Sequence, residues 1–322
     1  MGISEDIRAA HKTTQVEQRL TGIASASVDR RITLVRQLHD HFMPQLVPKF
    51  LPQVTKLLSD NDPAVRYQVV LLLQHLFDLH SKGFAKTSGA LAGLVQDARM
   101  DNRTAALGLL DKIALQEPKA VLPQLAKLVE WLDKPLPGVQ APLLQLITDI
   151  GRRAPTAVAA QLAKQLGSRK QATVRNALVL LEQVAERQPS AVARAAPRLV
   201  KLLGSRDANI RERASQMLIM AGAAGVEAVP RLLLRPLVAR KVDPDLKLHA
   251  ILTAQKLAER QPKQFAPAVH HLARDLGHQR WEIREQAALL LGIIGRDNIG
   301  LVKEAVPSLA HALKDGDELV RT

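Results

Sequence analysis

The sequence predicts an all-α protein, a right-handed α-solenoid of about eight helical hairpins with a period of 35–37 residues. Three observations lead to this prediction. The pentapeptide AERQP occurs twice, at residues 185–189 and 258–262. A branched apolar residue followed by a base recurs along nearly the whole chain. Aromatic residues make up only 2% of a chain that is 47% hydrophobic, so small aliphatic side chains must build the core.

The recurring pair fixes the period of the repeat, and we call its second residue the anchor. Successive anchors are 35, 36 or 37 residues apart, and a further unit is expected around Arg30. The two AERQP copies are 73 residues apart, which is two periods. The pairs are Val65-Arg66, Val174-Arg175, Ile210-Arg211, Leu246-Lys247, Ile283-Arg284 and Val320-Arg321, with weaker members at Asn102-Arg103 and Val139-Gln140.

Each anchor opens a segment with the pattern of an amphipathic helix, which we call the B helix. After Arg284, for example, apolar residues follow at Ala287, Leu290, Leu291 and Ile294. This spacing places them on one face of a helix with 3.6 residues per turn. The same pattern after the other anchors predicts one B helix in each unit.

A second amphipathic segment, the A helix, precedes each B helix and carries an early proline. Examples are AAPRLVKLL, AVPRLLLRPL and AVPSLAHAL. Proline is tolerated in the first helical turn, so it marks where an A helix begins. The turns between A and B are rich in Asp, Asn and Gly, as in SDNDPA, GSRDAN and KDGDEL. These residues are expected to cap the B helices.

This repeating sequence pattern resembles that of HEAT repeats, an armadillo-like helical family. Their units carry Pro in helix A, Asp in the turn and Val-Arg at the start of helix B. The segments APRLVKLLGSRDANIRERASQML and VPSLAHALKDGDELVR contain all three features. The resemblance implies a ladder of hydrogen bonds between anchors and turn aspartates of neighbouring repeats. Gln140, Lys247 and the proline-free third unit depart from the pattern, so irregular units are expected there. The residues given a structural role in this way are Arg66, Arg175, Arg211, Arg284, Arg321, Asp60, Asp207 and Asp315.

The repeat also sets the expected domain organisation. Residues 1–13 are predicted to be a flexible N-terminal segment, and residues 14–322 a single solenoid. The last repeat is predicted to be incomplete, because no B helix follows the anchor Arg321. An A helix without its B helix exposes apolar side chains, so we expect further chain or another subunit to cover that end.

Composition restricts the classes of protein that the chain can represent. The absence of Cys excludes disulfides, thiolate catalysis and zinc sites with Cys ligands. No apolar run approaches the roughly 18 residues of a membrane helix, and the N-terminus has no signal-peptide pattern. We therefore expect an intracellular protein, cytoplasmic or, in a eukaryote, nuclear, without a membrane partner.

The sequence contains no recognisable catalytic or metal-binding motif. It lacks a Gly-rich phosphate loop, Gly-x-Ser-x-Gly and His-Glu-x-x-His. His271 and Asp275 have the i, i+4 spacing of half a metal site, but surface histidines explain the pattern better. Trp131 and Trp281 are expected at the end of an A helix and in a turn, as packing residues. No enzymatic activity, cofactor, metal or small-molecule substrate is predicted.

Positive charge is concentrated in one part of the chain. The formal net charge is +14, and residues 151–250 contain 18 bases and 7 acids. Most of these bases lie on A helices or A-to-B turns and not in B helices, which places them on an outer surface and one edge. We take nine of them as candidate binding residues and call them the basic edge: Lys164, Arg169, Lys170, Arg198, Lys201, Arg206, Arg235, Arg240 and Lys241.

Two functions fit these observations. The first is a non-catalytic scaffold or adaptor that binds protein partners, acidic ones in particular, along an extended surface; its B-helix face is expected to expose neutral polar residues such as Gln145, Gln216 and Gln255. The second is a nucleic-acid-binding solenoid whose basic edge contacts phosphates without reading sequence. Aromatic residues for base stacking are absent from the basic segment.

Overall fold

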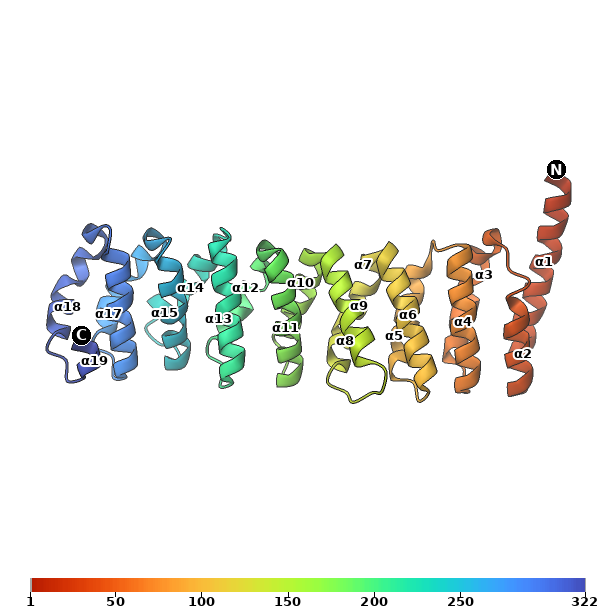
Figure 1. The fold of residues 1–322 in the computed structure, drawn as a ribbon, viewed down its shortest axis with the longest axis horizontal. Helices are drawn as coiled ribbons and strands as arrows, with labels where there is room; N and C mark the ends of the chain where they lie inside the picture. Colours follow the sequence, from red (N-terminus) through yellow and green to blue (C-terminus); the bar gives the residue numbers. More distant parts are fainter. Residues whose placement is uncertain (1, 322) are drawn as a thin grey trace. The chain divides into compact units, whose positions relative to one another are not determined.

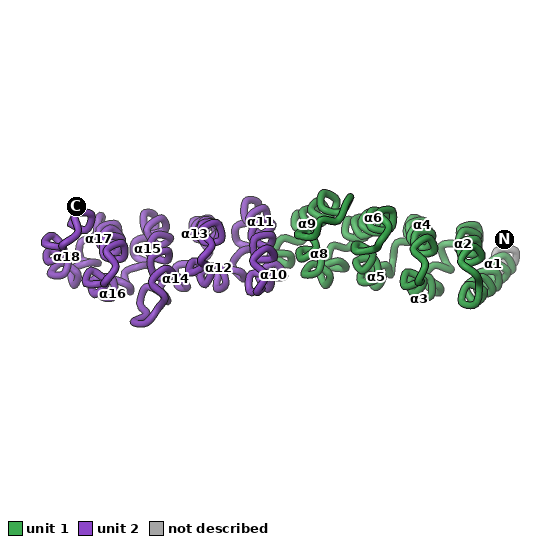
Figure 2. The backbone as a smooth tube through the Cα atoms, turned by 90° about the horizontal axis from the view of Figure 1, so that it is seen from below, with its two compact units in different colours: residues 1–158 green, residues 159–322 purple. Residues whose placement is uncertain are grey.

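The computed structural model describes the backbone of residues 2–321 and the side chains of residues 7–321. The described chain is helical, with turns between the helices and no strand. It divides into two compact units, residues 1–158 and residues 159–322. Each unit consists of two layers of helices, one formed by A helices and one by B helices (Figures 1 and 2).

In unit 1, each B helix contacts the B helix of the next repeat, so that α2, α4, α6 and α9 lie side by side. The A helices form the other layer, and several begin or end with a single 3-10 turn. The B helices are α2 (Val28–Leu38), α4 (Pro63–Leu79), α6 (Met100–Gln116) and α9 (Gln140–Arg153). The A layer comprises α1 (Gly2–Ile23), η1 (Pro44–Leu46), α3 (Val47–Lys56), η2 (Leu57–Ser59), η3 (Phe84–Thr87), α5 (Ser88–Gly93), η4 (Leu94–Gln96), α7 (Pro118–Val121), η5 (Leu122–Gln124) and α8 (Leu125–Trp131).

Unit 2 follows the same plan, with B helices α11, α13, α15 and α17 in contact in chain order. Helix α10 begins just before the boundary between the units. The B helices are α11 (Gln171–Arg187), α13 (Ala208–Ala223), α15 (Pro244–Ala258), α17 (Trp281–Gly295) and the short α19 (Glu318–Arg321). The A layer comprises α10 (Pro155–Gln165), η6 (Pro189–Arg194), α12 (Ala196–Leu202), α14 (Ala228–Val238), η7 (Pro262–Ala268), α16 (Val269–Asp275), η8 (Ile299–Ala305) and α18 (Val306–Ala312).

The residues predicted to mark the helix starts are confirmed both in the A layer and in the B layer. Proline occupies the first helical turn of η6, α12, η7 and α18. Aspartate caps the following B helix in three repeats, where its carboxylate accepts hydrogen bonds from two backbone N–H groups. These caps are Asp62 on α4, Asp207 on α13 and Asp243 on α15. A carboxylate at this position also interacts favourably with the positive end of the helix dipole.

The core of each unit is a continuous row of aliphatic side chains between the two layers. The residues predicted to face inward after Arg284, namely Ala287, Leu290, Leu291 and Ile294, are all 0% exposed. Trp131 ends α8 as predicted and is buried. Trp281 does not lie in a turn but opens α17, where it is 38% exposed.

The two predictions about the ends of the chain stay predictions. The boundary expected at residue 13 falls inside helix α1, whose backbone is described as helical from Gly2. At the other end, α19 carries the anchor Arg321 as its last residue. A groove of about 470 Å³ lies beside it, lined mainly by apolar side chains that include Leu289, Leu313 and Leu319.

The packing of α17 provides a matched pair of neighbouring leucines. Replacing the fully buried Leu290 with Ala should lower the free energy of unfolding by about 2–5 kcal/mol, because it removes apolar contacts and leaves a cavity. Replacing Leu289, which is 51% exposed, should cost much less. Urea unfolding followed by circular dichroism measures both, and equal losses would contradict the assigned inward face.

Candidate partner-binding surface

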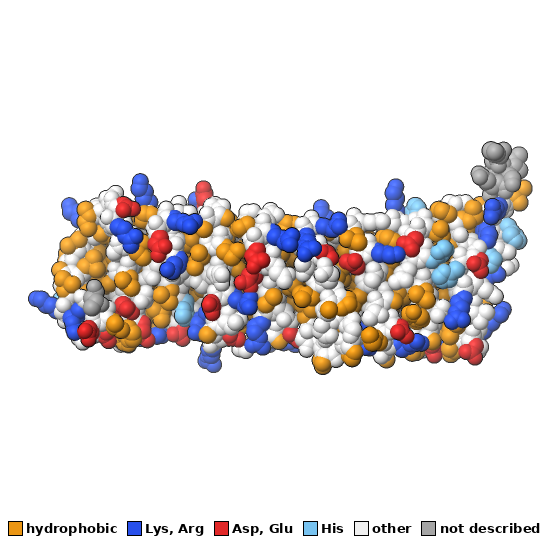
Figure 3. Space-filling model, viewed as in Figure 1, with side chains coloured by type: hydrophobic (Ala, Val, Ile, Leu, Met, Phe, Trp, Pro, Cys, Tyr) orange, Lys and Arg blue, Asp and Glu red, His pale blue; other side chains and the backbone are white. Residues whose placement is uncertain are grey.

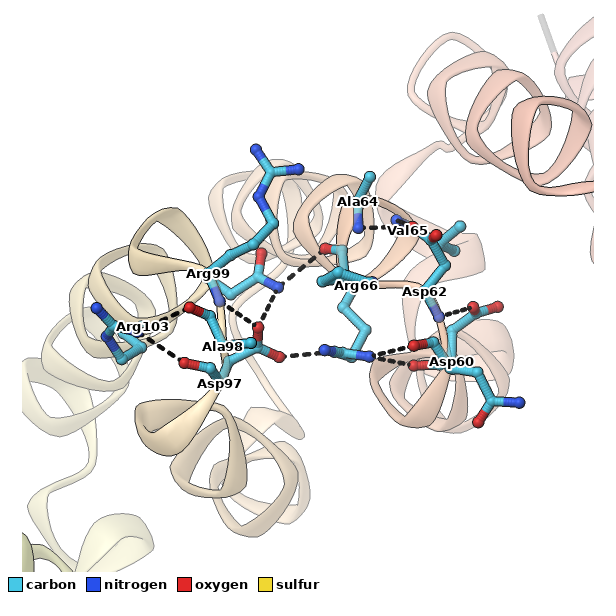
Figure 4. A network of polar contacts seen from close by, with 12 residues as sticks. Asp60, Asp62, Ala64, Val65, Arg66, Asp97, Ala98, Arg99 and Arg103 are labelled. Atoms are coloured by element: carbon cyan, nitrogen blue, oxygen red, sulfur yellow. Dashed lines mark hydrogen bonds and ion pairs between the residues drawn. The ribbon is translucent and has the colours of Figure 1, made fainter. Parts of the chain in front are cut away.

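The A-to-B turns are held by the anchor side chain, which is the fourth residue of nearly every B helix. In α4, Arg66 Nη1 donates to the carbonyl oxygens of Asp60 at 2.6 Å and Asn61 at 3.0 Å, both in its own turn (Figure 4). Its Nε donates to Asp97 Oδ2 in the next turn at 2.7 Å. One guanidinium group therefore closes its own turn and joins it to the neighbouring repeat.

The receiving carboxylate is bound on several sides. Asp97 Oδ1 accepts hydrogen bonds from the backbone N–H of Arg99 at 3.0 Å and from Asn102 Nδ2 at 2.9 Å (Figure 4). Burial alone would raise the pKa of Asp97, but the hydrogen bonds from Arg66, Arg99 and Asn102 outweigh it, and the pKa lies below its ordinary value. The ionised form of Asp97 is thus part of the folded structure.

The same arrangement recurs along both units and confirms the predicted ladder for Arg66, Arg175 and Arg284, whereas the hydrogen bonds of Arg211 stay within its own turn. The ion pairs between one repeat and the next are Arg31–Asp60 at 3.0 Å, Arg66–Asp97 at 2.7 Å, Arg175–Asp207 at 3.2 Å and Arg284–Asp315 at 2.7 Å. The anchors that donate to carbonyl oxygens of their own turn are Arg66, Arg103, Arg211, Arg284 and Arg321. The helical repeat expected around Arg30 has its anchor at Arg31. Arg103 reaches the carbonyl oxygen of Pro137 instead of a carboxylate.

The two departures from the anchor arginine keep part of its role. Gln140 donates through Nε2 to the carbonyl oxygen of Lys134, six residues earlier, which is the position that Arg66 reaches in its own turn. Lys247 Nζ lies 2.6 Å from Asp275 Oδ2, and both side chains are buried, at 5% and 6% exposure. Asp275 ends α16, three residues before the usual position of the receiving aspartate, and the sequence pattern did not reveal it.

The pairing of Lys247 with Asp275 also bears on the candidate half metal site of His271 and Asp275. The carboxylate of Asp275 is bound by Lys247, so it cannot act with His271 as a free pair of ligands. Burial, followed by the nearby Arg274, lowers the pKa of His271. Within the described part of the chain, no group of three or more potential metal-ligating side chains lies together.

The nine residues of the basic edge all lie in unit 2, and all nine are exposed. Three successive A-to-B turns carry Arg169 and Lys170, then Arg206, then Arg240 and Lys241. The preceding A helices carry the others: Lys164 on α10, Arg198 and Lys201 on α12, and Arg235 on α14. The positions predicted from the sequence therefore agree with the helices as found.

Close packing of glycines brings these turns together. A Cβ at Gly167 would overlap Arg198 Nη1, which shows that the Arg198 guanidinium lies directly against the turn before α11. A Cβ at Gly204 would lie 3.0 Å from Leu246 Cβ, so the turn before α13 rests on the start of α15. The three basic turns are consequently neighbours on one edge of unit 2.

The carboxylates of this region are largely bound elsewhere. Apart from Lys170, the residues of the basic edge make no side-chain hydrogen bond or ion pair with any described residue. Of the seven acids between residues 159 and 250, five are engaged by other groups: Glu182 by Arg213, Asp207 by Arg175, Glu227 by Arg231, Asp245 by Arg280, and Asp243 by the start of α15. Eight cations on this edge thus keep their full charge available to a partner.

The B-helix layer has a different character. On the face seen in Figure 3, Lys and Arg side chains are interspersed with Asp, Glu and hydrophobic side chains. Gln145 on α9 and Gln216 on α13 are exposed, as expected. Gln255 is partly buried, because its Nε2 donates to the backbone and side-chain oxygens of Gln286 on the next B helix. None of the described helices is long and apolar enough to cross a membrane.

Comparison with known proteins finds one family model and solved structures of similar fold. The family model of the adaptin N terminal region matches residues 30–261. No curated protein matches the chain in sequence. Among solved structures, the karyopherin Kap121p bound to the extreme C-terminus of the protein phosphatase Cdc14p is similar, with 15% identity, a TM-score of 0.52 and coverage of 95% of this chain and 36% of that chain. Kap121p bound to the SUMO protease Ulp1p matches with 16% identity and a TM-score of 0.52, and covers the same shares of the two chains. The chain thus spans about a third of the length of these structures.

The buried pair of Lys247 and Asp275 can be tested by removing one partner or both. Asp275→Ala should lower the free energy of unfolding by about 3–5 kcal/mol, because it leaves a buried ammonium group without a counter-charge. The double variant Lys247→Met with Asp275→Leu should be close to the parent in stability, since no charge remains buried. Urea unfolding of the three proteins measures this, and a double variant as unstable as Asp275→Ala would show that the pair is not the cause.

The lowered pKa of Asp97 predicts how stability depends on pH. Its contribution is present in full above the ordinary Asp pKa of about 3.9 and is lost as the pH falls through the lower pKa of the folded state. The variant Asp97→Asn lacks this contribution at every pH. The stability difference between parent and variant, followed by urea unfolding from pH 6 to pH 3, should therefore shrink on acidification; a constant difference would contradict the ion pair.

Proposed function

Since the chain belongs to the adaptin N-terminal region family, we propose that it is a non-catalytic scaffold that binds protein partners along the surfaces of its stacked helices. In a helical repeat each unit contacts only its neighbours, so long surfaces stay available for binding. Solved structures of the same fold support this proposal, because Kap121p is bound in them to the extreme C-terminus of the protein phosphatase Cdc14p or to the SUMO protease Ulp1p.

For this chain, the basic edge is the proposed docking surface, and its partner is an acidic protein segment. The observation that carries the proposal is that eight of its nine cations have no carboxylate partner among the described residues. Charges on three neighbouring turns can attract an extended anionic segment over a long range. Exposed Arg and Lys side chains also form strong charge-assisted hydrogen bonds with carboxylates.

A nucleic acid is the alternative partner, because unpaired cations in a row suit a phosphate backbone equally well. The basic edge holds no aromatic side chain on which bases could stack. Binding of this kind would depend strongly on salt and little on base sequence. Reversing charges on the basic edge and comparing a peptide with a DNA duplex separates an acidic protein partner from a nucleic acid.

Reversal of five charges tests the basic edge directly. The variant carries Glu at Arg169, Lys201, Arg206, Arg240 and Lys241, all of which are exposed. The probes are a fluorescent polyglutamate peptide and a mixed-sequence DNA duplex, titrated by anisotropy at about 50 and 200 mM salt. We expect the peptide to bind the parent in low salt and to lose at least about tenfold in affinity in the variant, while exposed charges leave melting nearly unchanged.

The opposite edge of unit 2 supplies a control with the same change in net charge. The exposed bases Arg187, Arg260, Lys263, Arg296 and Lys303 lie on or beside the B-to-A connections, and their replacement by Glu should leave peptide binding close to that of the parent. Equal losses in both variants would mean that net charge alone drives binding. Binding of the duplex without binding of the peptide would favour the nucleic-acid function, and no binding of either probe would exclude both uses of the basic edge.

A further inference from the structure

A small polar pocket lies along the junction of α1 and α2 in unit 1. Its volume is about 300 Å³, and its wall contains two arginines, two glutamines, one glycine and one leucine. No carboxylate lines it. The residues are Gln18, Arg19 and Gly22 from α1 and Arg30, Leu34 and Gln37 from α2.

Neither arginine of the pocket is neutralised by a carboxylate among the described residues. Arg19 donates through Nη1 to the carbonyl oxygen of Gln15 at 3.1 Å, but its buried Nε has no partner. Arg30 is exposed and pairs with no carboxylate among the described residues. Its neighbour Arg31 points elsewhere, to the ladder partner Asp60. Of these adjacent arginines of α2, Arg31 therefore belongs to the ladder and Arg30 lines the pocket.

Gly22 forms part of the pocket wall. A Cβ at this position would contact Leu34 Cδ1 at 3.5 Å, and Leu34 is itself buried, so α1 and α2 pack closely here. Because Gly22 lines the pocket, we expect a larger side chain at this position to take up part of its volume. The pocket can thus be filled by a substitution that changes no charge.

We propose that this pocket binds a phosphate monoester. Two guanidinium groups supply forked N–H donors and two positive charges, and two carboxamides add neutral donors beside them. A phosphate monoester carries a charge of about −1.5 to −2 near neutral pH, which matches the pair of arginines. A water molecule occupies about 30 Å³, so the pocket has room for the phosphate and for part of the group that carries it.

This inference goes beyond the proposed scaffold function and does not rest on it. The pocket is in unit 1, whereas the basic edge is in unit 2, and they share no residue. Failure of one proposal therefore leaves the other intact.

The test is a titration of the full chain with O-phosphoserine, with a short peptide that contains phosphoserine, and with the same peptide carrying serine. Isothermal titration calorimetry should show saturable binding of the phosphorylated ligands only. Similar affinity for both would indicate a free small phosphate, and tighter binding of the peptide would indicate a phosphorylated protein segment. The absence of saturation by either phosphorylated ligand up to about 10 mM, beyond the millimolar range of weak specific binding, would overturn the proposal.

Two variants and one control locate the binding. Arg19→Gln with Arg30→Gln should weaken phosphate binding at least about tenfold, because charge-assisted hydrogen bonds are lost. Arg8→Gln with Arg36→Gln removes the same charge from the same two helices outside the pocket and should bind like the parent. Gly22→Leu should abolish binding without altering charge, and circular dichroism checks that each variant is folded. If the control pair loses as much affinity as the pocket pair, or if folded Gly22→Leu binds like the parent, the pocket is not the site.

Discussion

The contact on which each unit depends is the double use of one guanidinium group at the fourth position of a B helix. Its first use is local, since Arg66, Arg211 and Arg284 each satisfy two carbonyl oxygens left over where an A helix ends. Its second use is to reach the next turn, as Arg66 does at Asp97 and Arg284 at Asp315. Because the group is planar, always charged and rich in donors, arginine fits both uses at once. The repeat is thereby cross-linked by polar bonds outside its apolar core.

That cross-link also determines which charges remain for other purposes. The turn carboxylates that could neutralise neighbouring bases are already bound by anchors or by helix starts, as Asp207 is by both Arg175 and the backbone of α13. A base placed in the turn outside the ladder, such as Arg206, then faces solvent without a partner. The same separation appears within one helix turn of α2, where Arg31 joins the ladder and Arg30 faces the pocket. Structural and available cations thus differ in position within the repeat and not in residue type.

The sequence was sufficient for the features that repeat and insufficient for those that occur once. The recurrence of the anchor predicted the B helices, the inward face of α17 and the ladder partners Asp60, Asp207 and Asp315, because period and position carry that information. Asp275 was missed as a ladder partner, since it lies three residues before the expected position and lysine, longer in its aliphatic stem and flexible, can still reach it. The place of Trp281 at the start of α17 was missed for a related reason, as the boundary of a helix is set by the geometry of its turn. The pocket beside Gly22 needs two helices in contact, which no local pattern encodes.

The departures from the ladder show that the two uses of the anchor can be separated. Gln140 retains the bond to the carbonyl oxygen six residues earlier, and a carboxamide can make no ion pair with the next turn. Lys247 retains the ion pair with the following repeat, now buried, although an ammonium group cannot reproduce the fork of arginine. Arg103 reaches a carbonyl oxygen of the next turn, Pro137, where no aspartate stands. Each of these three anchors thus keeps at least one bond at the A-to-B turn, and none keeps both bonds in their usual form. The bases of the basic edge lie on these turns or just before them. By bonding to the carbonyl oxygens of Ser205 and Arg206, for example, the anchor Arg211 fixes the backbone of the turn that carries the exposed Arg206 side chain.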